Sequence, residues 1–291
     1  MRSTLRLVNA SDPSRACDLC GSTSSEFVLS KNGADYRSCT SCGFIFADCS
    51  ESEWDEWNEA AFEEMLPGYI ERSFAPKKQE RYRRRLQRLE RYFGQGKLLE
   101  IGSNVGGFLH AARESGWSAV GLEPVDVCAR YARQEKQLDV RTETAEEANF
   151  EPGSFDVLYS SAVFEHLWSP TRTLQRAVEW LRPGGIVFLD TVNWDSYTRE
   201  RIGASWKLVD PRVHACLYTP RTLSRLCELA GLEVVRLESH RVRLRPNGSP
   251  APRGLARYSE ELRKLPLSVA SRFNHKGESI AVVAQRPVSK K

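Results

Sequence analysis

The segment 98–107, LLEIGSNVGG, constrains the fold of this chain more than any other part of the sequence. It reads as an apolar strand, a turn of small residues and the start of a helix. Gly102 and Gly106 have no side chain, so the backbone of this turn can approach a ligand closely. Strands and helices continue to alternate after it. The sequence therefore predicts an α/β fold with a doubly wound, mostly parallel, Rossmann-like sheet.

The elements of this alternation follow from apolar periodicity and from cap residues. We expect strands at 97–101, 118–122, 138–141, 155–160, 186–192, 232–237 and 279–285. We expect helices at 77–93, 107–115 and 126–134, and two more after the N-caps Ser169 and Thr219, each followed by proline. Pro183-Gly184-Gly185 is expected to end the helix that Ser169 begins. The segment 241–274 separates the last two strands and predicts an inserted helical element.

Length and composition set the outer limits of the interpretation. The 291 residues suffice for one large domain and one small one. We expect a flexible tail at 1–15, a small module at 16–50, a connector at 51–76 and the main domain at 77–291. No apolar run is long enough for a membrane span or a signal peptide, which predicts a cytoplasmic protein without a membrane partner. The net charge of +4 does not by itself imply a nucleic-acid partner.

Two close pairs of cysteines stand out near the N-terminus. Cys17 and Cys20 form the first pair, and Cys39 and Cys42 form the second. In a reducing compartment this spacing is typical of a four-cysteine zinc site of the zinc-ribbon kind, in which each pair makes a tight turn. Four sulfur ligands leave no open position, so the zinc would be structural. The metal would also supply folding energy to a module too small to build a sufficient core.

Acidic residues stand at the ends of two successive expected strands. Glu100 lies in the first strand, and Glu123 follows the second in the motif VGLE. Ligands of open α/β sheets bind at the carboxyl ends of the strands. An acidic side chain there can accept hydrogen bonds from the hydroxyls of a ribose. A carboxylate as buried as Glu100 should need a cationic partner. The turn departs from G-x-G-x-x-G, which disfavours a nicotinamide cofactor.

Four motifs occur in order between about residues 81 and 285: LLEIGSNVGGFL, VGLEP, FDVLYSSAVFEHLWSP and LRPGGIVFLDTVN. In this order and spacing they resemble the class I S-adenosylmethionine-dependent methyltransferases. The resemblance implies an enzyme that transfers a methyl group from S-adenosylmethionine. The residues that it implies for cofactor binding are Glu100, Gly102, Ser103, Asn104, Gly106, Glu123, Ala145, Glu146 and Ser161.

The resemblance also implies a place for each of these residues. Glu100 would lie near the methionyl amino group, and Glu123 would hold the ribose hydroxyls. The turn from Gly102 to Gly106 would lie under the methionine and ribose, Ala145 and Glu146 would meet the adenine, and Ser161 would line the cleft. Asn104 stands where the family usually has glycine, but asparagine tolerates left-handed backbone.

Two histidines are candidates for a base that removes a proton from the methyl acceptor. His166 follows the fourth expected strand, and His214 lies in the loop after the fifth. Each has an alternative interpretation in which it only organises its loop. The region from Trp206 to Leu232 resembles a subgroup that often acts on small molecules, including sugars and natural products. On this interpretation, an enclosed pocket is expected between Trp206, His214 and Asn193.

Two further functions stay open from the sequence. A zinc module ahead of such a domain also occurs in ribosomal RNA methyltransferases, and the expected helix 77–93 is basic. Phosphate contact is one interpretation of that helix, and a solvated face is the favoured one. The third function is a binding protein without catalysis, which the presence of both Glu100 and Glu123 disfavours. The preferred acceptor is a small molecule such as a sugar or a secondary-metabolite or polysaccharide intermediate.

Overall fold

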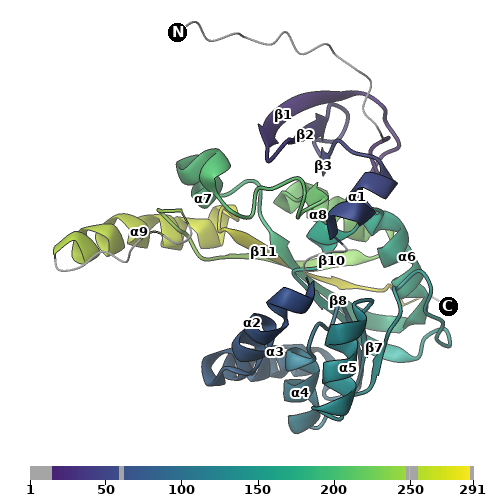
Figure 1. Ribbon diagram of the computed structural model, residues 1–291. Helices are drawn as coiled ribbons and strands as arrows, with labels where there is room; N and C mark the ends of the chain where they lie inside the picture. The colour runs from purple at the N-terminus through teal and green to yellow at the C-terminus, as the bar shows by residue number, and fades with distance from the viewer. Residues whose placement is uncertain (1–14, 59–61, 247–248, 250–254, 289–291) are drawn as a thin grey trace, which may run out of the picture.

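The structure is a computed structural model, and it describes residues 15–58, 62–246, 249 and 255–288 (Figure 1). The predicted flexible tail, apart from Arg15, lies outside the described residues. Within those ranges, no helix has both the length and the apolar character needed to cross a membrane.

A seven-stranded sheet in the order β10-β11-β8-β7-β4-β5-β6 forms the centre of the molecule. Its strands are β4 (Lys97–Ile101), β5 (Ser118–Leu122), β6 (Val140–Arg141), β7 (Phe155–Ser161), β8 (Leu181–Val192), β10 (Glu233–His240) and β11 (Ser279–Gln285). The pairings from β8 to β6 are parallel. Strand β11 is antiparallel to both of its neighbours. The expected doubly wound, mostly parallel sheet is confirmed.

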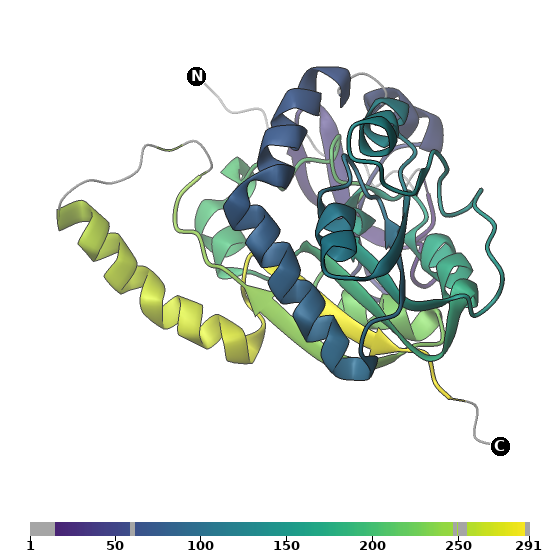
Figure 2. The same cartoon turned by 90° about the horizontal axis from the view of Figure 1, so that it is seen from below.

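Helices cover both faces of this sheet (Figures 1 and 2). On one face lie α2 (Phe62–Phe74), α3 (Pro76–Phe93), α4 (Gly107–Glu114) and α5 (Asp126–Gln134), and on the other lie α6 (Pro170–Trp180) and α8 (Pro220–Leu229). Leu86 of α3 and Phe108 of α4 pack with Val157 in one buried cluster. Leu174 of α6 and Leu223 of α8 belong to the other cluster. Helices α3, α4, α6 and α8 thus each bury an apolar stripe in these clusters, whereas α2 contacts α3, α4 and α5.

Several element boundaries differ from the expectation, and each difference has a local cause. Thr219 caps α8 with a reciprocal capping box to Thr222, as its sequence suggests. Ser169 precedes α6 without a side-chain cap, and its carbonyl accepts the ordinary first helical bond from the amide of Thr173. Strand β8 begins at Leu181 rather than at residue 186. The amide of Gly184 bonds to the carbonyl of Arg286 at 2.8 Å, so the proline-glycine segment continues the strand.

The remaining helices lie in segments whose structure the sequence only outlined. The segment expected as a connector contains α1 (Glu51–Asn58) and α2, and α2 contacts α4 and α5. The loop after β8 contains α7 (Tyr197–Ile202) and the short turn η2 (Gly203–Ser205), and η1 (Phe164–His166) follows β7. The inserted segment forms α9 (Leu255–Asn274), which extends away from the sheet (Figure 2).

The N-terminal segment forms a second, antiparallel sheet that includes a strand of the main domain. Strands β1 (Ser25–Lys31), β2 (Ala34–Cys39) and β3 (Ile45–Ala47) are followed in the sheet order by β9 (Cys216–Leu217). Ile45 pairs with Leu217 and Phe46 with Cys216. The buried side chains of this sheet join the same apolar cluster as α6 and α8. The sequence did not indicate this pairing.

Candidate active site and zinc centre

The glycine turn after β4 adopts left-handed backbone at three positions. Gly102, Asn104 and Gly106 have φ angles of 75°, 48° and 77°. Asn104 therefore adopts the conformation that its residue type allows. A β-carbon at Gly102 would overlap the side chain of Val163, so the turn also passes closely under the loop after β7. The turn leads directly into α4, whose N-terminus faces the carboxyl edge of the sheet.

The two acids lie on neighbouring parallel strands, where Glu100 pairs in register with Gly121 and Glu123 follows β5. Both are buried, with 6% of each exposed. The Glu123 carboxylate accepts from the amides of Asn104 at 2.7 Å and Val125 at 3.0 Å, which fixes its orientation. Burial raises the pKa of Glu123 above its usual range, although these two amides oppose the shift.

Glu100 differs from the expectation of a salt bridge. Among the described residues it has no ion-pair partner, and its Oε2 atom is buried without a hydrogen bond. Burial raises the pKa of Glu100 well above the usual range, and the charge of Glu123 raises it further, against a weaker opposing effect of Lys78. The Oγ atom of Ser103 is a second buried polar atom without a partner. Such atoms in a folded interior fit a polar ligand that completes their hydrogen bonds.

The other residues implied for the cofactor lie at the same edge of the sheet. Ala145 is buried in the loop after β6, and Glu146 beside it accepts a hydrogen bond from the hydroxyl of Thr173. Ser161 ends β7 and receives a 3.4 Å hydrogen bond from Arg85. Because β4, β5, β6 and β7 are parallel, their carboxyl ends converge on the glycine turn. These residues suit the nucleoside that the resemblance implies.

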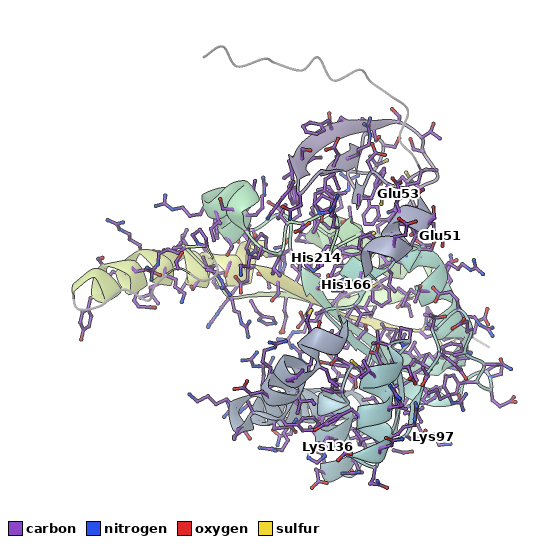
Figure 3. All side chains as sticks on the ribbon, in the orientation of Figure 1. Glu51, Glu53, Lys97, Lys136, His166 and His214 are labelled. Atoms are coloured by element: carbon purple, nitrogen blue, oxygen red, sulfur yellow. The ribbon has the colours of Figure 1, made fainter. Side chains whose placement is uncertain are left out.

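The structure brings the two candidate histidines together (Figure 3). The rings of His166 and His214 lie 4.7 Å apart between centroids, at 73° to one another. Nδ1 of His166 lies 2.6 Å from the carbonyl of Val213, and Nδ1 of His214 lies 2.6 Å from the carbonyl of Leu208. A carbonyl only accepts, so each Nδ1 carries a hydrogen and each Nε2 keeps its lone pair.

Burial controls the charge of this cluster. It lowers the pKa of His166, and together with the neighbouring His166 it lowers the pKa of His214 to about 3. Both rings are therefore neutral at pH 7 and can accept a proton. Glu165 is buried beside them and accepts a 2.6 Å hydrogen bond from Thr191. Burial raises the pKa of Glu165 to about 7.

Two residues expected to line an acceptor pocket pack inside the protein instead. Trp206 is completely buried in the apolar cluster shared with α6 and α8. Asn193 is also completely buried, and its amide nitrogen donates to the carbonyls of Asp195, His275 and Gly277. Both side chains serve the packing of the loop after β8, and the expected pocket between them and His214 is wrong.

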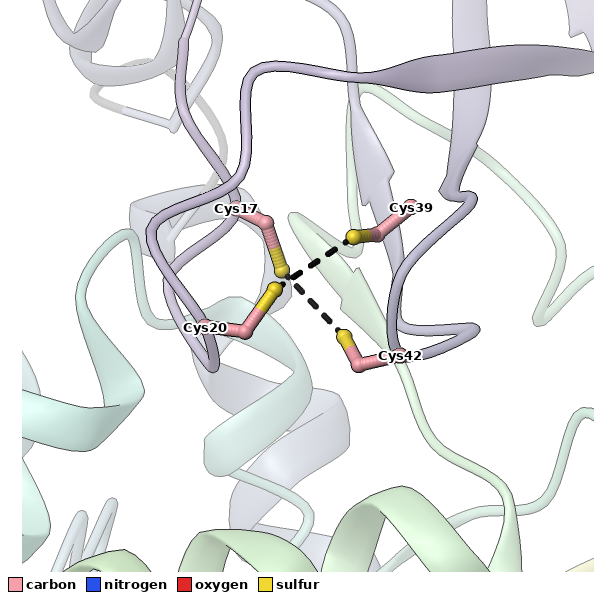
Figure 4. A group of neighbouring side chains, drawn as sticks. All are labelled: Cys17, Cys20, Cys39 and Cys42. Carbon is pink, nitrogen blue, oxygen red and sulfur yellow. Dashed lines mark hydrogen bonds between the residues drawn. The ribbon is translucent and has the colours of Figure 1, made fainter.

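The four N-terminal cysteines form one compact cluster (Figure 4). The Sγ atoms of Cys17 and Cys42 lie 3.5 Å apart, as do those of Cys20 and Cys39, and all four lie within 4.8 Å of one another. A tetrahedral zinc ion with bonds of about 2.3 Å requires sulfur separations of about 3.8 Å. The knuckle turns are present too, since the amides of Gly21 and Gly43 bond to the carbonyls of Cys17 and Cys39. The cluster fits zinc.

The sheet of this N-terminal module contacts the loop that carries His214. The hydroxyl of Tyr36 donates to the carbonyl of His214 at 2.7 Å. At the β1–β2 turn, Lys31 donates to the carbonyl of Trp206 at 2.9 Å and Asn32 to the carboxylate of Asp210 at 2.6 Å. Sequence reasoning missed these contacts, because nothing in the spacing of residues 31–36 and 206–214 relates the two segments.

The sheet order, the glycine turn and the two acidic strand ends together define a class I S-adenosylmethionine-dependent methyltransferase fold. The chain belongs to the methyltransferase-domain family, whose model, described as "Methyltransferase domain", matches residues 74–237. The ubiquinone biosynthesis O-methyltransferase of Azoarcus sp. (strain BH72) is 30% identical over 153 residues, which make up 48% of this chain and 66% of that relative. The match thus spans just under two thirds of the relative's length.

Solved structures show the same fold. A methyltransferase of Thermotoga maritima, described as a possible histamine N-methyltransferase, has a TM-score of 0.54 at 20% identity, covering 80% of this chain and 99% of its own. Phosphoethanolamine N-methyltransferase 2 of Haemonchus contortus, solved with S-adenosyl-L-methionine, has a TM-score of 0.55 at 18% identity, covering 84% and 62%.

Proposed function

We propose that this protein transfers the methyl group of S-adenosylmethionine to a small-molecule acceptor. The observation that carries the proposal is the pair of buried acids, Glu100 and Glu123, at the ends of adjacent parallel strands beside the glycine turn. Glu100 would accept from the methionyl ammonium group and Glu123 from the ribose hydroxyls. Gly102, Ser103, Asn104 and Gly106 would pass beneath the cofactor, while Ala145, Glu146 and Ser161 would border it.

The bound cofactor supplies an electrophilic methyl group, and the protein aligns the acceptor and excludes water. Either His166 or His214 would remove a proton where the acceptor must lose one, because both are neutral and keep a free Nε2. The relatives named as ubiquinone biosynthesis O-methyltransferases support a small-molecule acceptor. Sugars and secondary-metabolite or polysaccharide intermediates are included in this class.

Zinc would bind the N-terminal cysteine cluster as a structural metal, and Cys17, Cys20, Cys39 and Cys42 would complete its coordination. Its contribution would be to hold the β1–β3 sheet, through which Tyr36 and Lys31 contact the loop of His214. The module at 16–50 would therefore support the acceptor side of the site. We place the protein in the cytoplasm, where four reduced thiols are available to the metal.

Titration of S-adenosylmethionine into the protein tests the cofactor site. Glu123→Gln and Glu100→Gln should each weaken binding about tenfold or more, because hydrogen bonds to charged groups contribute about 1.5–3 kcal/mol. Glu114→Gln, on the exposed end of α4, is the matched control and should bind normally. Undiminished binding by both site variants would refute this placement of the cofactor. A wild-type protein that binds but transfers no methyl group would favour a binding protein.

Methyl transfer to the acceptor is tested separately by release of S-adenosylhomocysteine from small molecules and from RNA. Turnover with RNA alone would favour the ribosomal RNA methyltransferase function. Replacing His166 and His214 by alanine should lower the turnover number for an acceptor that loses a proton, with cofactor affinity unchanged. A turnover number equal to that of the wild type in both variants would exclude the two histidines as general bases.

A further inference from the structure

A cluster of basic side chains lies beside the proposed cofactor site, on the inner side of α3. Lys78, Arg81 and Arg85 recur at helical spacing, so they share one face of that helix. Arg241 follows directly after β10. We call these four residues the basic cluster. Sequence reasoning favoured a solvated surface for this helix. Arg81 and Arg241 are exposed, whereas Lys78 and Arg85 are half-buried, and Arg85 contacts the sheet.

Arg85 fixes the position of the basic cluster. It is half-buried and forms an ion pair of 2.7 Å with Asp190 of β8. It also donates to the hydroxyl of Tyr159 at 2.7 Å and to Ser161 at 3.4 Å, both in β7. The cluster is therefore anchored at the carboxyl ends of β7 and β8, where the acceptor must approach the cofactor.

The N-terminal turns of α3 connect the cluster to the glycine turn. Gln79, next to Lys78, is buried and donates to the carbonyl of Gly107 at 2.9 Å. Gly107 begins α4 directly after the turn. The cluster and the proposed cofactor site thus share one edge of the sheet.

Among the described residues, the four cations of the basic cluster form a single ion pair. Asp190 pairs with Arg85, and Lys78, Arg81 and Arg241 form no ion pair within the ranges that the structure describes. Burial lowers the pKa of Lys78, and the charges of Arg81 and Arg85 lower it further. Burial likewise lowers the pKa of Arg81, and Arg241 adds to the shift. These cations repel one another, so an added anion would relieve the repulsion.

The outer face of the same helix shows the opposite arrangement. Arg83 and Arg84 both pair with Glu80, at 3.1 and 2.8 Å. Arg88, three residues after Arg85 and therefore on the same face as the basic cluster, lies 3.8 Å from Glu238 of β10. Arg83 and Arg84 thus have an acidic neighbour on their own helix, whereas Lys78, Arg81 and Arg241 form no ion pair among the described residues.

We propose that Lys78, Arg81 and Arg241 bind a phosphate group of the methyl acceptor. Three cations match the charge of a phosphate ester or diphosphate better than the single charge of a carboxylate, and two arginine forks suit phosphate oxygens. The inference rests on the proposed function, since it defines the acceptor as a phosphorylated small molecule. Arg85 would orient the group through its fixed position without giving up Asp190.

Calorimetric titration of the zinc-loaded protein with inorganic pyrophosphate, at fixed ionic strength, tests this site without turnover. We expect saturable binding at one site. Arg81→Ala and Arg241→Ala should each weaken it by about 10- to 100-fold, as loss of a charge-assisted hydrogen bond does. Arg84→Ala is the matched control on the outer face and should change the affinity less than twofold. Equal weakening in Arg84→Ala, or no saturable binding, would overturn the proposal.

Two further arms separate the alternatives. Acetate should fail to compete with pyrophosphate, and competition at equal concentration would indicate a carboxylate site instead. A short single-stranded RNA is the second competitor. If it binds more tightly than pyrophosphate and its binding also depends on Arg81 and Arg241, the acceptor is a nucleic acid and the small-molecule proposal is overturned. S-adenosylmethionine should bind all three variants like the wild type. If the wild-type protein does not bind S-adenosylmethionine, the proposed function is refuted, whether or not the protein binds pyrophosphate.

Discussion

The neighbouring groups His214 and Glu165 should make opposite contributions to stability as the pH changes. His214 in the unfolded chain takes up a proton below its ordinary pKa of 6.5, whereas in the folded protein it stays neutral down to about 3. Its burial therefore has little effect above pH 6.5 and destabilises the protein increasingly as the pH falls below that value. At about 1.4 kcal/mol per pH unit, the loss between about pH 7 and pH 5 is about 2 kcal/mol.

Glu165 acts in the other direction. Its pKa is raised from 4.5 to about 7 by folding, so the folded protein holds a proton that the unfolded chain releases. Its contribution to stability is full below 4.5 and is lost as the pH rises toward 7. Between about pH 5 and pH 7 this loss is also about 2 kcal/mol. In the wild-type protein the two effects should nearly cancel across this interval.

Single substitutions separate the two effects. His214→Gln should gain about 2 kcal/mol relative to the wild type when the pH is lowered from about 7 to 5. Glu165→Gln should show the reverse, a gain of similar size when the pH is raised from about 5 to 7. Urea unfolding followed by tryptophan fluorescence measures both free energies, and glutamine keeps an N–H for the carbonyl of Leu208. The account of His214 and Glu165 would be refuted if, in both variants, the difference in unfolding free energy from the wild type did not change with pH.

Three further predictions concern the metal, the glycine turn and the module contact. In Cys39→Ser, metal analysis should find bound zinc reduced from one equivalent toward zero. Cys49→Ser, outside the cluster, is the control and should keep its zinc. Equal zinc content in the two variants would contradict the four-cysteine site. Gly102→Ala should weaken S-adenosylmethionine binding about tenfold or more, because a left-handed alanine costs about 1–2 kcal/mol and its β-carbon overlaps Val163. Gly203→Ala also places alanine at a positive φ, but no atom lies within 4 Å of its β-carbon, so binding should stay intact. Equal losses in the two variants would refute the overlap. Tyr36→Phe should lower the unfolding free energy by about 1–3 kcal/mol in denaturant titration, because the buried His214 carbonyl loses its donor, and an unchanged value would show that the contact contributes nothing.

Local patterns were sufficient to predict the main sheet and to place the candidate cofactor residues at its carboxyl edge. The glycine turn and the acids Glu100 and Glu123 are close in sequence to the strands that carry them, so periodicity and strand ends locate them. The cysteine cluster was predictable for the same reason, because each Cys-x-x-Cys pair is a local turn. Parallel strand order then places Ala145 and Ser161 at the same edge.

The contacts that the sequence did not reveal all join distant segments. His166 and His214 lie in loops that follow different strands, and their ring contact depends on how the loop after β8 folds back. The ion pair of Arg85 with Asp190 likewise joins a helix before the sheet to a strand in its middle. Glu100 was expected to have a cation because a buried charge needs one. Among the described residues it has no ion-pair partner, and burial raises its pKa instead. Trp206 and Asn193 have ordinary loop positions in the sequence, which gave no sign of their burial.

The pairing of β3 with β9 has a consequence for biosynthesis. Residues 15–47 leave the ribosome before the rest of the described chain. The strand that completes their sheet, β9, is translated only after five of the seven strands of the main sheet, β4 to β8. Until then, the edge of β3 is open to other chains. A nascent chain that captures its metal early would protect two knuckles but not that edge, which closes only once β9 has been translated.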